Sequence, residues 1–352
     1  MKACEQDVKH LERLYEGRRP YHGEMHDHAA TGGTSDGKCT LAEWIERMKE
    51  LELDFAAILD HAQVRHMYQP EWKDGLFVGG TEPGTRIKDD KTELHYNMVF
   101  AAPEPLEKIL TKFEEFQFTG GSEGHFKYPD FMHDRFCELI DSVKEAGGFF
   151  VHPHPKQAMV SDNPIDYWFR DETGLEVFYR DMRNRHTERN YELWTTLLAM
   201  DKRIWACAGG DGHREASDAA ITTIYAEKYS TQTYLDHLRE GDFICGSVGI
   251  RMCMGDTRMG GKCDFAGKRL VFAIGDFHKS VRNSEHQYRV VLLNDEGVVC
   301  SQEISCMEPA YFAIDAEACK FYRVEVFDET ENLRIAIGNP IWNISKRFAN
   351  TY

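Results

Sequence analysis

Strand-like and helix-like patterns of apolar residues alternate over about the first 240 residues. After Thr40, apolar residues repeat at the spacing of one helix face, and Thr40 with Glu43 has the signature of a capping box. Residues 54–61 (DFAAILDH) then form an almost unbroken apolar run, as in a buried parallel strand. Repeated strand–helix units predict a parallel sheet, and their number favours a closed or distorted barrel.

The pattern changes near residue 245. From there on, short segments alternate apolar and polar residues, separated by turn residues such as NDEG at 294–297. This pattern is typical of a small antiparallel domain, and we expect a β-sandwich. The sequence therefore predicts an α/β barrel over residues 1–245 and an all-β domain over residues 246–352.

Composition narrows the classes of function. The 352 residues carry a formal net charge of −17 without a cluster of Lys and Arg, which argues against nucleic acid as the main partner. No apolar run is long enough to cross a bilayer, and the charged N-terminal segment has no apolar signal-peptide core. None of the ten cysteines forms a C-x-x-C pair, which fits free thiols in a reducing compartment. We expect a cytoplasmic protein with no membrane partner.

Residues that can bind metals occur where the predicted strands end. His26 and His28 alternate at the end of the first strand, so both imidazoles point to one face. Chemistry in barrels collects at the carboxyl ends of the strands, and the later strands end at further candidates: Asp60, His61, Glu82, His152, His154, Asp211 and His213. His95 comes early in its strand, so we expect it to reach the site from a loop or a bent strand. Crowding these groups into one pocket would be costly unless cations pair with them.

The candidates belong to an ordered series of short motifs between residues 18 and 245: MHDH, SDG, LDH, GTE, HYN, HP and GDGH. In this order the motifs resemble those of the polymerase and histidinol phosphatase (PHP) hydrolases. The segments YHGEMHDH, GTEPGT and GNPIW are most similar to the branch named after carbaryl hydrolysis. The resemblance implies a distorted seven-stranded (βα)7 barrel that holds two or three divalent cations (zinc, manganese or iron).

The resemblance also implies which residues would hold each cation. The first ion would be bound by His26, His28, Glu82 and Asp211. Glu82 would bridge to a second ion, bound also by His95 and one histidine of HPHP, where the family spacing favours His154 over His152. A third ion would be bound by His61, His213 and Asp36, which stands where some members have histidine.

We expect a metal-dependent hydrolase, most simply a phosphoesterase acting on a small phosphorylated molecule. A water held between two cations would become the hydroxide nucleophile. Asp60 or His213 could relay a proton, and His152 would assist from beside the ligands. Three arginines could bind a phosphate group in a forked geometry: Arg183, Arg185 and Arg214. Substrate selection would come from the loops at 62–75 and 155–172.

Two other functions fit the same residues. The metals could serve the hydrolysis of a carboxylic or carbamic ester, or the chain could be a metal-holding binding protein without catalysis. The complete ligand set favours an enzyme, because a structural metal site fills its coordination with protein groups. The β domain contains none of the motifs, so we expect it to support the barrel, and it could also form a homodimer.

Overall fold

The chain divides into two units, each built from segments that are far apart in sequence. The computed structural model describes residues 2–86, 93–116, 130, 132–155, 169–214 and 220–346. The barrel unit comprises His22–Thr222 and Lys228–Arg239. The β unit comprises Met1–Tyr21, Thr223–Glu227 and Glu240–Tyr352. Strands β1 (Arg19–Asp27) and β10 (Ile221–Ala226) contribute residues to both units.

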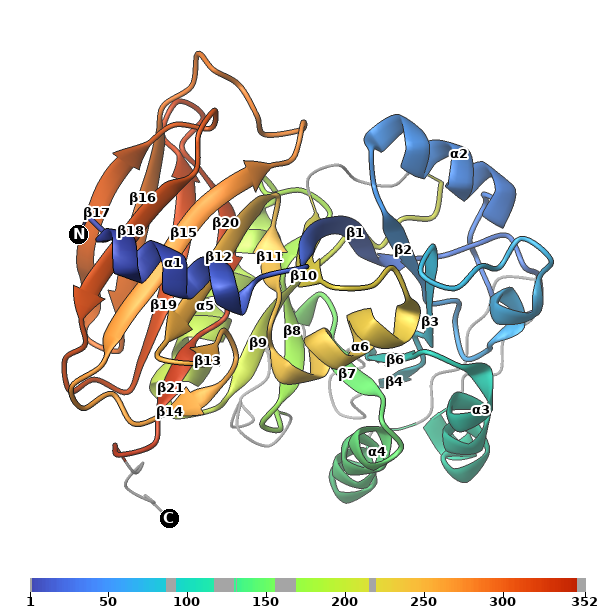
Figure 1. Cartoon of the computed structure of the whole chain (residues 1–352). Helices are drawn as coiled ribbons and strands as arrows, with labels where there is room; N and C mark the ends of the chain where they lie inside the picture. Colours follow the sequence, from blue (N-terminus) through green and yellow to red (C-terminus); the bar gives the residue numbers. More distant parts are fainter. Residues whose placement is uncertain are drawn as a thin grey trace. The chain divides into compact units, whose positions relative to one another are not determined.

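The barrel unit is built on a curled sheet (Figure 1). Within the described ranges its strands follow the order β1-β2-β3-β6-β7-β8-β9. The strands after β1 are β2 (Phe55–Ile58), β3 (Phe77–Thr81), β6 (Asn97–Phe100), β7 (Phe149–His152), β8 (Thr173–Tyr179) and β9 (Ile204–Gly209). The two ends of this row meet where Asp27 pairs with Gly212, just after β9. The predicted α/β fold with a distorted barrel sheet is therefore confirmed.

The sheet is mixed, so the expectation of a wholly parallel sheet is wrong. Strand β6 is antiparallel to both β3 and β7, whereas the other neighbours are parallel. The reason is the hairpin β4 (Gly84–Arg86) and β5 (Glu93–His95), from which the chain returns antiparallel to β3. The start of β6 consequently lies at the same edge of the sheet as the ends of the other strands.

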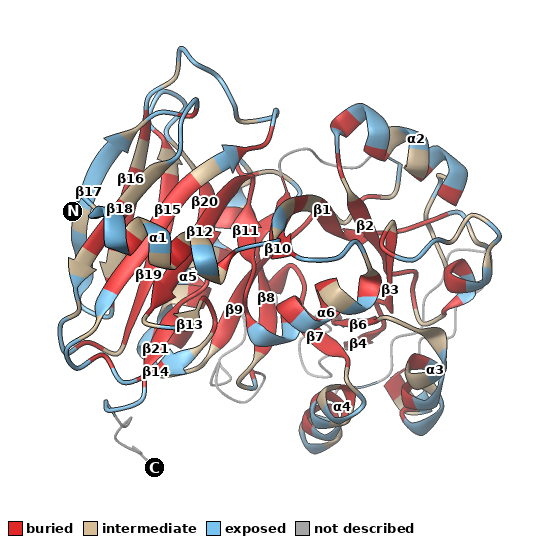
Figure 2. Ribbon diagram, in the orientation of Figure 1, coloured by how far each residue is buried: buried red, intermediate tan, exposed pale blue. Residues whose placement is uncertain are grey.

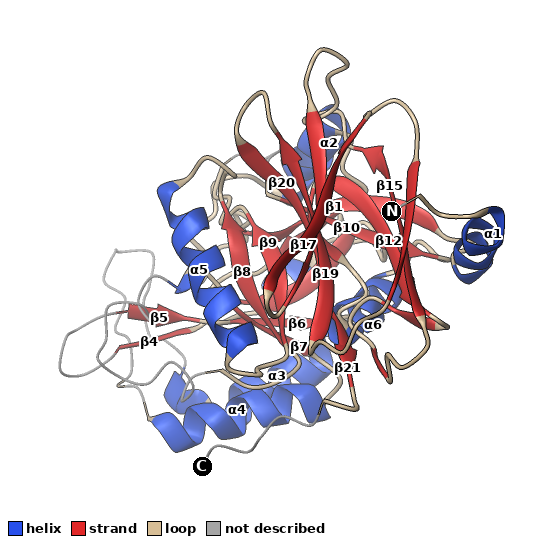
Figure 3. Cartoon of the chain, turned by 90° about the vertical axis from the view of Figure 1, so that its left-hand side faces the viewer, coloured by secondary structure: helices blue, strands red, loops and turns tan. Residues whose placement is uncertain are grey.

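Amphipathic helices surround the barrel strands. They are α2 (Leu41–Leu51), α3 (Pro103–Lys112), α4 (His133–Glu145), α5 (Arg185–Ala199) and α6 (Thr231–Glu240), with the short 3-10 helices η1 (Arg65–Tyr68) and η2 (Glu114–Phe116). Helix α4 packs against β7, and α5 packs against β8 and β9 (Figure 3). Figure 2 shows that the barrel strands are largely buried and that the helices have one buried and one exposed face. In the described part of the chain, no helix is long and apolar enough to cross a membrane.

The capping box predicted at Thr40 is present. Thr40 Oγ1 accepts from the backbone N–H of Glu43 (3.2 Å), and the Glu43 carboxylate accepts from the N–H of Thr40 (2.7 Å). The predicted apolar face of α2 is buried at Leu41, Trp44, Met48 and Leu51, with Ile45 partly buried against the same core. Trp44 also donates to the carbonyl of His28 (3.0 Å), which ties the helix to the end of β1.

The described part of the β unit contains two sets of antiparallel strands, as the pattern after residue 245 predicts, and one further pair, β14 with β21, is parallel. One set has the order β13-β12-β15-β18, and the other contains β17, β16, β19, β20 and β11. The two sets of strands face each other. A Cβ added at Gly338 on β20 would lie only 3.5 Å from the side chain of Ile250 on β12. The strands are β11 (Ile244–Gly246), β12 (Val248–Met254), β13 (Thr257–Arg258), β14 (Lys262–Cys263), β15 (Arg269–Phe277), β16 (Tyr288–Asn294), β17 (Gly297–Ile304), β18 (Ala310–Asp315), β19 (Phe321–Asp328), β20 (Leu333–Gly338) and β21 (Ile341–Asn343).

The N-terminal helix α1 (Glu5–Leu14) belongs to the β unit, although the sequence pattern groups it with the barrel. It packs against β12 and β15. Leu11 is fully buried, and Arg251 on β12 pairs with Glu12 (2.7 Å). These partners are about 240 residues away in sequence, so no local pattern reveals them.

Candidate metal centre

Among the residues that the structure describes, nine imidazole and carboxylate groups meet at the edge of the barrel sheet where most strands end. Their ligand atoms form three overlapping groups, within each of which all atoms lie within 4.8 Å of one another. The first group is His26, His28, Glu82 and Asp211; the second is Glu82, His95 and His154; the third is His28, Asp36, His61 and His213. Glu82 belongs to two of these groups, and so does His28.

The first group is buried except for the partly exposed Asp211, and its atoms are spaced like the ligands of a single ion. His26 Nε2 lies 3.3 Å from Glu82 Oε1, and His28 Nε2 lies 3.3 Å from Glu82 Oε2 and 3.4 Å from Asp211 Oδ1. Two ligand atoms that are each about 2.1 Å from a tetrahedral ion are about 3.4 Å apart. These separations are longer than good hydrogen bonds and match ligands that share a cation.

The second group shows which histidine of HPHP joins the cluster. His154 Nε2 lies 2.9 Å from Glu82 Oε1, and His95 Nδ1 lies 3.1 Å from the same oxygen. His95 reaches the group because it is the last residue of β5, two positions before the antiparallel strand β6, whose start lies at the ligand edge. We expected a loop or a bent strand to bring His95 to the site. In the structure, the reversed direction of β6 does so.

The third group is the most open. His213 Nε2 lies 3.0 Å from Asp36 Oδ2, and His61 Nε2 lies 3.5 Å from Asp36 Oδ1. The side chains of His213 and Asp36 are 30% and 36% exposed, whereas those of the first group are at most 11% exposed. Solvent therefore reaches the centre from the third group.

Hydrogen bonds to one ring nitrogen orient several of the imidazoles. The Nδ1 atoms of His61 and His213 lie 2.8 Å from the carbonyl oxygens of Glu82 and Asp211, and His26 Nδ1 lies 3.0 Å from Glu176 Oε1. In each case Nδ1 carries the proton and Nε2 is left to bind an ion, as in known metal sites.

The residues fit divalent cations. Five inward-facing atoms are buried and make no hydrogen bond of good geometry to any described residue: His26 Nε2, His28 Nδ1 and Nε2, Glu82 Oε2 and Asp36 Oδ1. Buried polar atoms without partners are rare and costly. The three groups of imidazole and carboxylate ligands could therefore hold several metal ions.

Without a bound cation, the electrostatics of the first group favour protonated imidazoles and ionised carboxylates. Burial lowers the pKa of His28, but the carboxylates of Asp211 and Glu82 raise it to about 10. Burial would raise the pKa of Glu82, yet the neighbouring His26, His95 and His154 hold it well below the usual range. A cation must therefore displace protons from imidazoles that are paired with carboxylates.

Asp60, expected to relay a proton, binds the loop that follows β1. Its carboxylate accepts from the N–H of Ala29 (2.7 Å), from Ser35 Oγ (3.0 Å) and from Thr31 Oγ1, and His66 Nδ1 lies 3.2 Å away. Burial raises the pKa of this carboxyl, but the contacts with His66 and the loop lower it overall. These contacts give Asp60 a role in shaping the loop, and its part in proton transfer stays a prediction.

His152, expected to assist catalysis, lies among aromatic rings and outside the three groups. Its ring centroid is 4.5 Å from that of Phe169 and 5.0 Å from that of Phe150. Burial lowers the pKa of His152 to about 3, so the imidazole is neutral at ordinary pH. The structure thus surrounds His152 with aromatic rings, and its part in catalysis stays a prediction.

The three arginines expected to bind phosphate, Arg183, Arg185 and Arg214, have exposed side chains. Another arginine, Arg180, contacts a candidate ligand: its guanidinium donates to Asp211 Oδ2 (3.0 Å) and is 56% exposed. Arg180 has a left-handed backbone with φ of 61°, as do Asp211 and His154 with φ of 53° and 27°. Such strained residues often occur at functional sites.

Two further side chains that the sequence analysis missed come from β8. Glu176 contacts His26, and Tyr179 donates to Asp211 Oδ2 (2.8 Å). The signal that could have found Glu176 is a lone acid inside the apolar run GLEVFY. Of the predicted specificity loops, residues 62–75 contain η1, and residues 156–168 lie outside the described residues.

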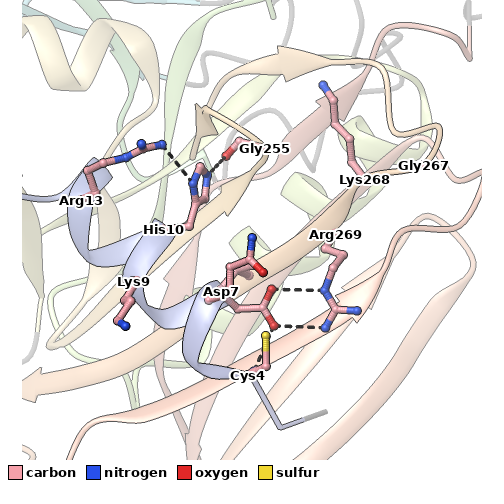
Figure 4. Close-up of a pocket in the computed structure, with 11 residues that line it drawn as sticks. Cys4, Asp7, Lys9, His10, Arg13, Gly255, Gly267, Lys268 and Arg269 are labelled. Atoms are coloured by element: carbon pink, nitrogen blue, oxygen red, sulfur yellow. Dashed lines mark hydrogen bonds and ion pairs between the residues drawn. The ribbon is translucent and has the colours of Figure 1, made fainter.

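A separate hollow of about 950 Å³ lies in the β unit, between α1 and the start of β15 (Figure 4). Its lining includes cationic groups, most of which have partners within the protein. Arg269 forms two bonds with Asp7 (3.2 Å each), and His10 lies 3.0 Å from the carbonyl of Gly255. These described contacts make the hollow part of the attachment of α1 and set it apart from the metal centre.

Comparison with known proteins gives distant structural likenesses. No family model matches the chain, and no curated protein matches it. Similar solved structures include a candidate metal-dependent phosphoesterase from Bifidobacterium adolescentis (17% identity, 54% of this chain and 87% of that one, TM-score 0.36). Others are a lesion-specific endonuclease from Pyrococcus furiosus (13%, 63% and 56%, 0.44) and an amidohydrolase from Chromobacterium violaceum (15%, 56% and 89%, 0.36).

Proposed function

We propose that the chain is a metal-dependent phosphoesterase that hydrolyses a small phosphorylated molecule. The observation that supports this most strongly is the position of Glu82 between two ligand groups. Its two oxygens lie 2.9–3.4 Å from imidazole nitrogens of five histidines: His26, His28, His61, His95 and His154. A single carboxylate among so many imidazoles is suited to hold two cations close together.

The proposed roles of the residues follow from these groups. Adjacent divalent cations lower the pKa of water and offset negative charge on phosphoryl oxygens. Glu82 and His28 hold neighbouring groups together, and Asp211 completes the first group from the end of β9. Asp36 and His213 line the open side, where a substrate would enter. Within the described residues the cluster offers three carboxylates and six imidazoles.

Arg180 favours a phosphorylated substrate over a neutral ester. Its guanidinium lies beside Asp211, with its carbon 5.1 Å from the ring centroid of Tyr179, and is more than half exposed. A planar guanidinium can donate two parallel hydrogen bonds to phosphate oxygens. We assign this residue the phosphate-binding role that the sequence suggested for its neighbours.

A panel of chromogenic esters tests the proposal. The purified protein should hydrolyse phosphate esters after loading with manganese or zinc, and chelation should abolish the activity. Hydrolysis of carboxylic or carbamic esters alone would assign the centre to the other reaction. Metal binding without any hydrolysis would leave only a metal-holding protein.

Arg180→Ala separates the substrate classes. It should raise KM for a phosphate ester by about tenfold or more, because a charge-assisted contact is lost. The matched control is Arg189→Ala, an exposed arginine on α5, which should leave KM within about twofold. Equal effects of the two substitutions would contradict the role of Arg180.

A further inference from the structure

Strand β8 contains a bulge that turns two polar side chains toward the metal centre. Its register with β9 pairs Glu176 with Cys207 but Phe178 with Ala208, so Val177 is an extra residue. In a regular strand, residues three apart point to opposite faces of the sheet. One inserted residue restores a common face, which explains why Glu176 and Tyr179 both reach candidate ligands.

Glu176 links a ligand of the first group to a ligand of the second. Its Oε1 lies 3.0 Å from His26 Nδ1, and its Oε2 accepts the backbone N–H of His154 (2.6 Å). Glu176 is 1% exposed. The second contact holds the backbone of His154, which has a φ of 27° that side-chain-bearing residues rarely adopt. One buried side chain therefore orients one imidazole and fixes the backbone that carries another.

Tyr179 supports the remaining carboxylate of the first group. Its hydroxyl donates to Asp211 Oδ2 (2.8 Å), while Asp211 Oδ1 faces His28 Nε2 (3.4 Å). The Tyr179 ring also lies 5.2 Å from the ring of His154. The hydroxyl thus engages one carboxylate oxygen and leaves the other directed toward the ligand group.

We propose that Glu176 and Tyr179 are positioning residues that set the ligand geometry of the first and second groups, while the third group, which shares only His28 with the first, is held largely by His61, His213 and Asp36. The inference rests on the proposed function only in requiring that the centre binds cations. The bulge in β8 is then the structural feature that couples two cation sites to one strand.

Metal affinity, measured apart from activity, tests the inference. Full-length protein is titrated with zinc against a chromophoric chelator, and its absorption with cobalt is recorded as a report of ligand geometry. Glu176→Gln should weaken two of the bound ions by about 10–100-fold and change the cobalt spectrum, while the ion of the third group binds as in the wild type. Tyr179→Phe should weaken only the ion that Asp211 helps to bind, by about tenfold.

Matched substitutions in the β unit control for general destabilisation. Tyr225→Phe removes a similar bond, from the tyrosine hydroxyl to Asp276 (2.6 Å), and Glu325→Gln neutralises a carboxylate that is also 1% exposed. Both should keep wild-type zinc affinities and cobalt spectra, even where melting temperatures fall. If Glu176→Gln does not fold, the zinc affinities and the cobalt spectrum of Tyr179→Phe still test the positioning role.

The outcomes separate this inference from the proposed function. Wild-type protein that binds less than one ion per chain overturns both. Wild-type protein that binds several ions, with unchanged affinities and spectra in the folded Glu176 and Tyr179 variants, overturns only the positioning role. Ion binding that depends on Glu176, without phosphate ester hydrolysis in the wild type, overturns only the proposed reaction.

Discussion

Individual ligands differ in how many cations they serve, and substitution should reveal the difference. Glu82 belongs to the first and second groups, whereas His61 belongs only to the third. Glu82→Ala should lose two ions and fall to background activity, because neither group keeps its shared carboxylate. His61→Ala should lose one ion, with turnover reduced by about 10²–10³-fold, a typical loss for one electrostatic stabiliser.

Elemental analysis beside rate measurements checks this contrast. Glu145→Ala, at the exposed end of α4, is the control that should keep both metals and rate. Equal metal loss in the two ligand variants, or a fully active Glu82→Ala, would falsify the sharing of Glu82.

The protonation of His28 gives the centre a pH dependence with a definite sign. Its ordinary pKa is 6.5 and its pKa in the metal-free fold is about 10. A raised pKa stabilises the metal-free fold fully below the unfolded value, and this stabilisation is lost as the pH rises through the folded value. The metal-free protein should therefore melt at progressively lower temperature as the pH rises from about 7 to about 10.

Metal binding should show the opposite trend. Since an ion must displace the proton on His28, its apparent affinity should rise about tenfold per pH unit over the same range, as expected for one released proton. Titration calorimetry in buffers of different ionisation enthalpy measures the released protons directly. Binding without proton release at pH 7 would show that the imidazoles are already neutral.

At the scale of secondary structure elements, the sequence located the strand ends better than the strand directions. Periodicity and motifs predict which residues close each strand, because apolar runs and the polar residues after them are local signals. The direction of β6 depends on the hairpin β4–β5, whose pairing is a tertiary choice. His95 was therefore predicted as a ligand with an unexplained position, and the reversed strand supplies the explanation.

The bulge in β8 was beyond sequence reasoning for a similar reason. An inserted residue is defined only by the register with a neighbouring strand, here the pairing of Glu176 with Cys207 and of Phe178 with Ala208. Without that register, Glu176 and Tyr179 are three residues apart on a strand and are therefore expected on opposite faces of the sheet. The sequence therefore indicates the ligands, which lie in recognisable motifs, but not Glu176 and Tyr179, which contact those ligands.

Gly209 on strand β9 leaves space for the carboxylate of Glu176, and a substitution at this glycine tests whether the space is needed. A Cβ added at Gly209 would overlap Glu176 Oε1 and lie 2.9 Å from the Cβ of His26. Gly209→Ala should therefore displace both side chains, lower the free energy of unfolding by about 1–3 kcal/mol and weaken the ion of the first group. Thermal melts and zinc titration measure the two effects.

A second strand glycine provides the control. A Cβ at Gly275 on β15 would meet only Pro309 at 3.6 Å or more, so Gly275→Ala should leave both stability and metal affinity nearly unchanged. Wild-type zinc affinity in Gly209→Ala would show that the glycine does not protect the ligand geometry.

For the whole molecule, the sequence predicted the two kinds of architecture but not how the chain is divided between them. The change of pattern near residue 245 marks where the β strands begin, and this is visible locally. The return of Met1–Tyr21 to the β unit depends on contacts such as Tyr15 with Met252 and Asp7 with Arg269. Contacts over such sequence separations leave no periodic signal.

This division predicts how a shortened chain behaves. A chain of residues 1–245 keeps α1 but lacks β12 and β15, against which α1 packs. Leu11 and Tyr15, which are 0% and 4% exposed in the full chain, would then lose their cover, and exposed apolar patches promote aggregation. We expect this truncated chain to be largely insoluble, as measured by the soluble fraction after expression and by light scattering.

Removing residues 1–18 as well should recover part of the solubility, because the uncovered helix is then absent. A soluble, metal-binding chain of residues 1–245, no more prone to aggregate than the chain of residues 19–245, would show that α1 does not need the β strands.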